Sequence, residues 1–280
     1  MKWTPGGVSD NIEDQRSSGG GGGFRGGGKV GLGGLLVAGV LSLVLGRDFI
    51  TPLITGDGGS AQPRQVDEAR DREEEPRVKF VSFVLDDSQN TWRKIMGSQY
   101  RDARLVLFRD AVKSGCGTAG SETGPFYCPG DEKLYIDLSF FDELARKYGA
   151  PGDFAQAYVL AHEVGHHVQK VMGISAKVRN AQESQPSQAN QLSVRQELQA
   201  DCFAGVWGNS TQQRGILEKG DVDSGLAAAA AVGDDRLQKQ ARGYVSPESF
   251  THGSSAQRTQ WFRRGFESGD VRQCDTFGTR

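Results

Sequence analysis

The chain has 280 residues, a formal net charge of −2 and a pI of about 6.1. A weakly acidic chain without a basic patch gives little support for nucleic-acid binding. Gly accounts for 39 residues, and a large share of them lies between residues 17 and 34. Such a tract buries too little apolar surface to offset its ordering entropy. We therefore expect residues 1–29 to form a flexible Gly-rich tail.

Residues 30–46 form an apolar run of 17 residues without a charged side chain. A spanning helix needs about 20 apolar residues, and ~17 is near the lower limit. Basic residues precede the run, and the positive-inside rule then leaves the N-terminus in the cytoplasm. We expect a single-pass anchor at 30–46, a polar linker at 47–76, and a globular domain at 77–280 on the far side of the membrane from the cytoplasm.

Two other interpretations of this apolar run remain open. A cleaved signal peptide is one, although the leader before the run is long and no A-x-A site follows it. A Gly-rich apolar linker, or a helix within an oligomer, is the other.

Short apolar segments open the globular part of the chain. Residues 80–85 fit either a short strand or the start of a helix. Asn90 is a suitable N-cap for a helix at 91–99, in which apolar residues recur at helical spacing. Residues 103–108 are apolar and predict a strand.

A cysteine-containing loop and a second strand follow. We expect residues 110–129 to be a loop, and residues 133–138 to form a half-buried strand because polar and apolar residues alternate there. This strand is a candidate for binding an extended peptide substrate as an added strand.

Helices make up most of the remaining chain. Capping residues and apolar periodicity predict helices, and residues 176–190 fit a loop or an exposed helix. The predicted helices span residues 140–148, 154–172, 193–207, 226–240 and 256–266. The sequence therefore predicts a mainly helical α+β fold, with a small sheet beside the helix at 154–172.

Four cysteines suggest disulfide bonds in an exported chain. None of them forms a C-x-x-C pair, so a cysteine zinc site has no support. Of the three pairings that four cysteines allow, we choose Cys116 with Cys128 and Cys202 with Cys274. The alternative is four reduced thiols, which a cytosolic location would favour.

Three of the four histidines lie between residues 162 and 167. His162 and His166 are four residues apart on a predicted helix, so they project from one face and can bind one ion. Glu163 lies beside them, where it can reach water at the metal. The H-E-x-x-H spacing therefore predicts a catalytic zinc site, with one ion per chain and Glu163 as the general base.

A catalytic zinc site needs a third protein ligand and an open fourth position. A carboxylate on a following helix can supply it, and Glu197 and Asp201 lie at i and i+4 on the helix at 193–207. We assign Glu197 as the third ligand and Asp201 as the acceptor of the free N–H of a ligating histidine, His162 by preference. Glu183, in the polar segment, is the rival third ligand.

We expect different roles for the other two histidines. His167 lies about 100° round the helix from His166, so we expect it to pack or to donate a hydrogen bond rather than to bind metal. His252 precedes the last helix and is a candidate donor to a developing oxyanion. An ordinary role in a helix-entry loop explains His252 equally well.

Several stretches of the chain resemble one family, the YpfJ-type neutral zinc metallopeptidases of bacteria. The family pattern covers nearly the whole chain, from the N-terminal SDNIEDQR and Gly-rich tract to the C-terminal region. The stretches that carry the resemblance are HEVGHHVQ, SVRQELQADCFAGVW, THGSSAQRTQWFRRGFESGD and FYCPGDEKLYIDLSFFDEL. The resemblance implies a membrane-anchored, zincin-like peptidase of the gluzincin type, in which a glutamate is the third ligand. The anchor would then lie in a bacterial inner membrane, and the catalytic domain at 77–280 in the periplasm or outside the cell.

Two functions follow from these observations. The first is hydrolysis of a peptide or protein substrate by a zinc-activated water, with Glu163 as the base. The alternative is a non-catalytic, membrane-anchored binding module that keeps zinc for stability. A structural zinc site usually has four protein ligands, and only three are evident here.

Overall fold

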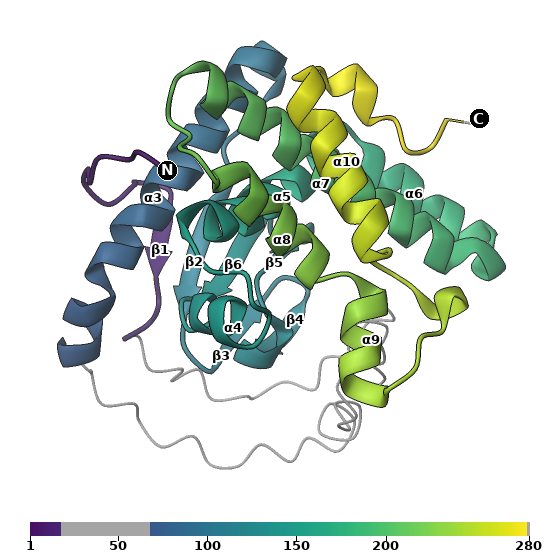
Figure 1. Ribbon diagram of the computed structural model, residues 1–280, viewed down its shortest axis with the longest axis horizontal. Coiled ribbons are helices and arrows are strands. Elements are labelled where there is room, and N and C mark those ends of the chain that lie inside the picture. The colour runs from purple at the N-terminus through teal and green to yellow at the C-terminus, as the bar shows by residue number, and fades with distance from the viewer. Residues whose placement is uncertain (18–67, 279–280) are drawn as a thin grey trace.

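The computed structural model describes residues 1–17 and 68–278. These residues form an α+β fold that is mainly helical, as the sequence predicts (Figure 1). The predicted anchor at 30–46 lies outside the described residues, as do residues 18–29 of the Gly-rich tail and most of the polar linker.

Helices account for most of the described chain. They are α3 (Glu68–Met96), α4 (Phe140–Arg146), α5 (Asp153–Val171), α6 (Ile174–Ser184), α7 (Ala189–Gln213), α8 (Asp221–Ala231), α9 (Asp234–Arg242) and α10 (Ser255–Ser268). The strands are β1 (Ile12–Asp14), β2 (Arg104–Phe108), β3 (Ala111–Ser114), β4 (Gly117–Gly120), β5 (Phe126–Cys128) and β6 (Lys133–Asp137).

A four-stranded sheet has the order β1-β2-β6-β5. The pairs β1–β2 and β2–β6 are parallel, while β5 runs antiparallel to β6. The predicted strands at 103–108 and 133–138 are therefore confirmed as β2 and β6. The prediction that 133–138 offers an edge to a substrate is wrong, because β6 is paired on both sides and β5 is the edge strand.

One long helix replaces two predicted segments. Residues 80–85 and 91–99 both belong largely to α3, so neither the strand alternative nor the N-cap at Asn90 is correct. Two of the polar residues between these segments, Asp87 and Gln89, are buried and accept hydrogen bonds from other parts of the chain. The Asp87 carboxylate accepts from the Trp207 indole, and the Gln89 side chain accepts from the backbone N–H of Ala103.

Other boundaries also differ from the prediction. The region 110–129 is not a simple loop, because it contains the antiparallel hairpin β3–β4 and the edge strand β5. The segment 176–190 is mostly helical, as α6 and the start of α7. The predicted helix at 226–240 is two helices that meet at Gly233, where a Cβ atom would lie 2.4 Å from the backbone N of Ser255.

Helix α5 lies in the core and packs against α3, α7, α8 and the sheet. Helices α7 and α10 cross so closely that their contact requires glycine. A Cβ atom on Gly265 would lie 1.9 Å from the Cys202 carbonyl oxygen, and one on Gly205 would lie 2.1 Å from that of Phe262. These contacts hold α7 and α10 together.

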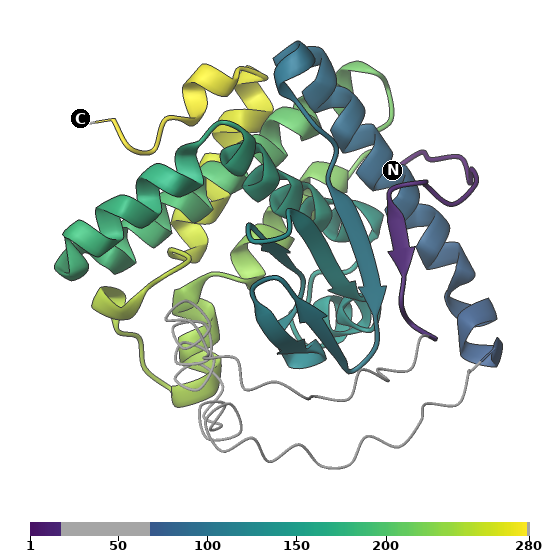
Figure 2. The ribbon, with the colours of Figure 1, turned by 180° about the vertical axis from the view of Figure 1, so that it is seen from behind.

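Residues 1–17 are part of the fold, which corrects the prediction of a flexible tail for this segment. Strand β1 pairs with β2 and lies beside α3 (Figure 2). The Met1 ammonium group lies 3.0 Å from Asp221 Oδ2, and the Trp3 indole donates to Asp153 at the start of α5. The segment lacks apolar periodicity, so its sequence does not predict these long-range contacts.

The far end of this segment enters a buried ion cluster. Arg16 and Arg109 both donate to Glu74 Oε2, at 2.9 and 2.6 Å. All three side chains are almost fully buried. Because Glu74 lies in α3, the predicted domain start at residue 77 falls inside a helix and is wrong.

The predicted location in the inner membrane is contradicted. Among the described residues, no helix is long and apolar enough to cross a bilayer. The predicted topology also puts residues 1–17 and the catalytic domain on opposite sides of a membrane. This is incompatible with the pairing of β1 and β2 in one sheet.

Both predicted disulfides are present. Cys116 bonds to Cys128 and ties the β3–β4 hairpin to β5, and Cys202 bonds to Cys274 and ties the C-terminal segment to α7. The alternative of four reduced thiols is therefore wrong.

The N-terminal contacts predict that Trp3→Ala destabilises the protein. Its ring lies 5.2 Å from that of Phe80, and its indole bond to Asp153 would be lost. We expect a loss of about 2 kcal/mol, which lowers the Tm by ~4–8 °C in a thermal melt. The control is Val8→Ala, because the Val8 side chain in the same segment is 49% exposed. An unchanged Tm for Trp3→Ala would show that this segment does not stabilise the fold.

Candidate metal centre

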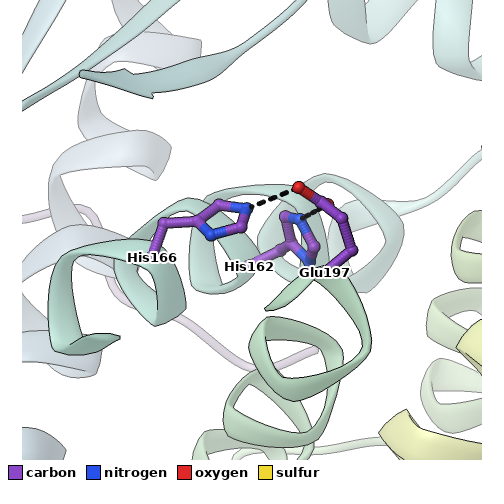
Figure 3. A group of neighbouring side chains, drawn as sticks. All are labelled: His162, His166 and Glu197. Atoms are coloured by element: carbon purple, nitrogen blue, oxygen red, sulfur yellow. Dashed lines mark hydrogen bonds and ion pairs between the residues drawn. The ribbon is translucent and has the colours of Figure 1, made fainter. Parts of the chain in front are cut away.

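His162, His166 and Glu197 lie together with their ligand atoms within 4.8 Å of one another. The Nε2 atoms of His162 and His166 are 3.1 and 3.4 Å from the two carboxylate oxygens of Glu197. Figure 3 shows both rings directed at this carboxylate. Two imidazole nitrogens and a carboxylate oxygen are a donor set that suits zinc.

The helix geometry explains this arrangement. His162 and His166 are four residues apart on α5, so their side chains stack on one face. Helix α7 approaches that face at Gly165, where a Cβ atom would lie 3.0 Å from the carbonyl oxygen of Ala200. This close approach brings Glu197, three residues before Ala200, up to the two histidines.

The Asp201 carboxylate is fully buried and has four donors from two other helices. The Tyr158 hydroxyl and His162 Nδ1 donate to Oδ1, at 2.5 and 2.9 Å. Arg258 donates its Nε to Oδ2 at 2.8 Å and its Nη2 to Oδ1 at 2.9 Å. Since a carboxylate accepts the Nδ1 proton of His162, Nε2 is the nitrogen that faces Glu197, and it can bind a metal once its own proton is lost.

Charge in this cluster controls protonation. Burial lowers the pKa of His162, but the Asp201 carboxylate and the Glu197 hydrogen bond outweigh burial and raise the pKa to about 10. The pKa of His166 is also raised, because its interactions with Glu197 outweigh the effect of burial. The two histidines hold the pKa of Glu197 well below its usual value, although burial acts to raise it. In the metal-free protein, protons therefore compete with a metal ion for these nitrogens.

Glu163 follows His162 on α5, and only 8% of its surface is exposed. Burial raises its pKa, an effect that the neighbouring charges of His162 and His166 oppose. A buried carboxylate with a raised pKa is a stronger base than an exposed one.

His252, in the loop before α10, forms a pair with Asp234 at the start of α9. His252 Nδ1 lies 3.1 Å from Asp234 Oδ1, while Asp234 Oδ2 accepts the backbone N–H groups of residues 251–253. Burial lowers the pKa of His252, but Asp234 and the charge of Glu197 raise it above its ordinary value. His252 keeps 42% of its side chain exposed, so its other nitrogen is open to solvent.

The remaining candidates lie outside the triad. His167 is buried and donates from Nε2 to the Arg101 carbonyl at 2.7 Å, while its Nδ1 lies 3.1 Å from the Tyr127 hydroxyl. This matches the expectation that it packs and forms hydrogen bonds. Glu183 is exposed near the end of α6 and does not belong to the triad.

A cavity of about 200 Å³ opens beside the triad. Its lining includes two members of the triad together with residues from β5, α6 and α7. They are Tyr127, Pro129, His166, Ser175, Ser193, Gln196 and Glu197. The cavity therefore joins the edge strand β5 to the triad.

Three residues around the triad were not predicted from the sequence. Tyr158 lies four residues before His162 and Gln169 lies three after His166, so helical spacing alone could have placed both on the same face of α5. Arg258 had no comparable signal, because the spacing of an arginine does not tell a buried one from an exposed one.

Removal of Arg258 should leave the Asp201 charge without its main counter-charge. We expect Arg258→Met to lower the free energy of unfolding by about 3–5 kcal/mol, measured by urea denaturation. The control is Arg214→Met, which breaks an ion pair with Asp87 but starts from a side chain that is 34% exposed, and should cost less. Equal losses for the two variants would contradict the inference that the Asp201 cluster depends on Arg258.

A family model described as "Putative neutral zinc metallopeptidase" matches residues 1–277. The protein YpfJ of Escherichia coli strain K12 is 50% identical over 287 aligned positions, which cover 99% of each chain. The Mycobacterium bovis protein Mb2605 is 44% identical over 197 aligned positions, which cover 66% of each chain.

No solved structure matches the chain significantly. The match to the family model extends over nearly the full length, and it includes both helices that carry the triad. The chain therefore belongs to the family of neutral zinc metallopeptidases that includes YpfJ.

Proposed function

We propose that the protein is a zinc-dependent peptidase that hydrolyses peptide bonds at the triad of His162, His166 and Glu197. The observation that supports this most strongly is the orientation of the two imidazoles. Both Nε2 atoms face one carboxylate, and the Nδ1 of His162 is held by Asp201. Membership of a zinc metallopeptidase family supports zinc as the ion.

The residues fit zinc in number and in chemistry. Three ligands from two helices, with a cavity beside them, leave room for a fourth position, as catalytic zinc sites require. Zinc bound there supplies a Lewis acid that lowers the pKa of water and polarises a peptide carbonyl. A structural site would more usually be closed by a fourth protein ligand.

Glu163 is the proposed general base. It removes a proton from the attacking water and then delivers that proton to the nitrogen of the leaving amine. Burial raises the pKa of Glu163. A carboxyl group with a raised pKa is better able to hold the proton between its removal from water and its delivery to the amine.

His252 is the proposed electrophilic partner. Asp234 holds its Nδ1 and its backbone, and the exposed nitrogen is free to donate a hydrogen bond to the oxygen that gains charge in the transition state.

The edge strand β5 is the proposed docking site for the substrate backbone. Among the described residues it pairs only with β6, and Tyr127 in β5 lines the cavity next to His166 and Glu197. An extended peptide added to this edge would pass the triad. The sheet edge, the α5 motif and the α7 ligand together make a zincin-like arrangement.

Hydrolysis of an unfolded protein tests this function directly. We expect the zinc-loaded wild-type protein to cleave it and a chelator to stop the reaction. Glu163→Gln should keep its zinc but lose about 10²–10⁴-fold in kcat. Glu183→Gln, the same change at an exposed glutamate, is the control and should retain wild-type activity.

Two outcomes would contradict the proposal. Full activity of Glu163→Gln would remove the proposed base. Bound zinc without hydrolysis in any substrate screen would instead favour the binding-module function.

A further inference from the structure

We propose that Gln169 is a positioning residue for His166, and that it is held in turn by Gln199 and the disulfide-bonded C-terminal segment. These groups form a hydrogen-bonded relay from Cys274 to the triad. The inference rests on the proposed metal site. It goes beyond that proposal because it ties the metal affinity to a segment more than 70 residues after Glu197 in the sequence.

The first step of the relay sets the tautomer of His166. Gln169 is fully buried, and its Nε2 donates to the backbone carbonyl of Gln196 at 2.7 Å. A carbonyl can only accept, so the amide is oriented with its Oε1 towards His166. His166 Nδ1, 2.9 Å from this Oε1, must then be the donor. With Nδ1 committed to Gln169, Nε2 is the nitrogen that faces Glu197 and is available to a metal ion.

The second step connects Gln169 to the C-terminal segment. Gln199 donates its Nε2 to the carbonyl oxygen of Cys274 at 2.9 Å. This carbonyl orients the Gln199 amide, so Gln199 Oε1 accepts the second proton of Gln169 Nε2 at 3.1 Å. The backbone carbonyls of Gln196 and Cys274 therefore fix the orientation of both side-chain amides, and with it the donor and the acceptor of each hydrogen bond in the relay.

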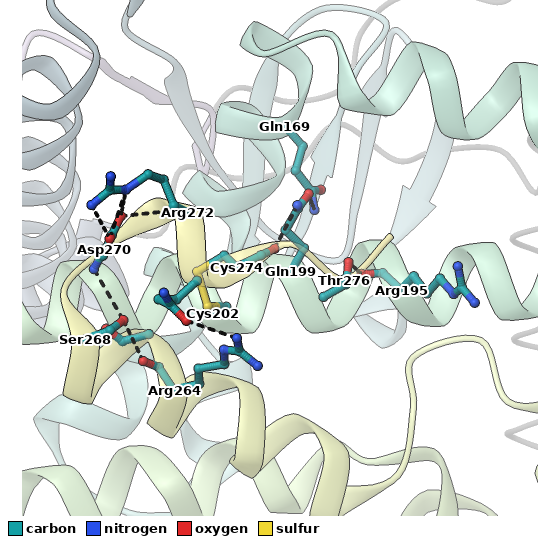
Figure 4. The surroundings of a disulfide bond; sticks show 12 residues. Gln169, Arg195, Gln199, Cys202, Arg264, Ser268, Asp270, Arg272, Cys274 and Thr276 are labelled. Carbon is teal, nitrogen blue, oxygen red and sulfur yellow. Dashed lines mark hydrogen bonds and ion pairs between the residues drawn. A yellow bond between two sulfur atoms is a disulfide. The ribbon is translucent and has the colours of Figure 1, made fainter. Parts of the chain in front are cut away.

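The disulfide holds the last member of the relay in place. Cys274 is buried and bonds to Cys202 on α7, one turn of helix from Gln199. The hydroxyl of Thr276 donates to the Arg195 carbonyl at 2.7 Å, which fastens the same segment a second time. Figure 4 shows Gln169, Gln199 and Cys274 side by side around the sulfur–sulfur bond.

The two metal-binding histidines are thus oriented in different ways. His162 is held by a charged carboxylate within the cluster of α5, α7 and α10. His166 is held by a neutral amide, whose orientation depends on α7 and the C-terminal segment. Outer partners of this kind commonly change metal affinity when they are removed.

Zinc affinity of the full chain tests the relay, measured by competition with a chromophoric chelator. Gln169→Met keeps the length of the side chain but removes the acceptor, and we expect zinc binding to weaken by about 10- to 100-fold. Gln199→Met and the double variant Cys202→Ala with Cys274→Ala act further from the ligand. We expect each to weaken binding by about 2- to 10-fold, the equivalent of one hydrogen bond.

Non-additivity distinguishes a relay from separate losses of packing. If Gln199 acts through Gln169, the double variant Gln169→Met with Gln199→Met should bind zinc about as weakly as Gln169→Met alone. The visible absorption bands of the Co²⁺-loaded protein should change in Gln169→Met, because they report the ligand geometry. If Gln169→Met does not fold, Gln199→Met combined with the cysteine variants provides the same test.

Matched controls exist elsewhere in the chain. Gln238 in α9 is 2% exposed, and both ends of its side-chain amide form hydrogen bonds with residues of the segment that follows. Gln238→Met therefore removes a buried amide outside the relay. Cys116→Ala with Cys128→Ala removes the other disulfide. Both controls should bind zinc like the wild type.

The possible failures are distinguishable. Wild-type zinc affinity in Gln169→Met, or losses that simply add in the double variant, would overturn the relay and leave the metal site standing. A wild-type protein that does not bind zinc would overturn both proposals.

Discussion

The buried ion pair between Asp201 and Arg258 is the interaction on which the rest of the site depends. Asp201 belongs to α7 and Arg258 to α10, and the same carboxylate accepts from Tyr158 and His162 on α5. Three helices therefore meet at one fully buried charge. A buried pair of this kind is weak evidence for net stability, since desolvation offsets its Coulomb energy. Its effect is on geometry: it orients His162 and fixes α5 relative to α7.

Close packing makes this arrangement possible. Helix α5 meets α7 at Gly165, and α7 meets α10 at Gly205 and Gly265, where side chains would collide with backbone atoms. The short distances bring a ligand from α7 next to two ligands from α5. Because these helices contribute to the buried core, the triad is attached to packed helices, as a site that must hold its ligands in a fixed geometry requires.

Helical periodicity was the strongest predictor in the sequence. The four-residue spacings of His162 with His166, and of Glu197 with Asp201, predict shared faces, and the structure brings those faces together. The role of these residues as ligands stays a prediction. The disulfide pairs were also predicted, and both are present.

Long-range contacts explain most of the failures. The segment 1–17 contains few apolar residues, so nothing local predicts that Ile12 pairs with Leu105 across the sheet. Asp87 is a charged residue between two apolar segments of the sequence, yet it is buried, and Trp207 and Arg214 donate hydrogen bonds to it. Arg258 is a similar case, since its partner lies 57 residues earlier in the chain. Such partners are known only once the fold is known.

The central claim is that zinc binds at His162, His166 and Glu197, and a zinc titration of two glutamate variants tests it most directly. We predict that the wild-type protein and Glu183→Ala each bind one zinc ion per chain with the same affinity. Glu197→Ala should bind zinc at least about 100-fold more weakly, because a ligand is lost. Unchanged affinity in Glu197→Ala, or a loss in Glu183→Ala instead, would contradict the account.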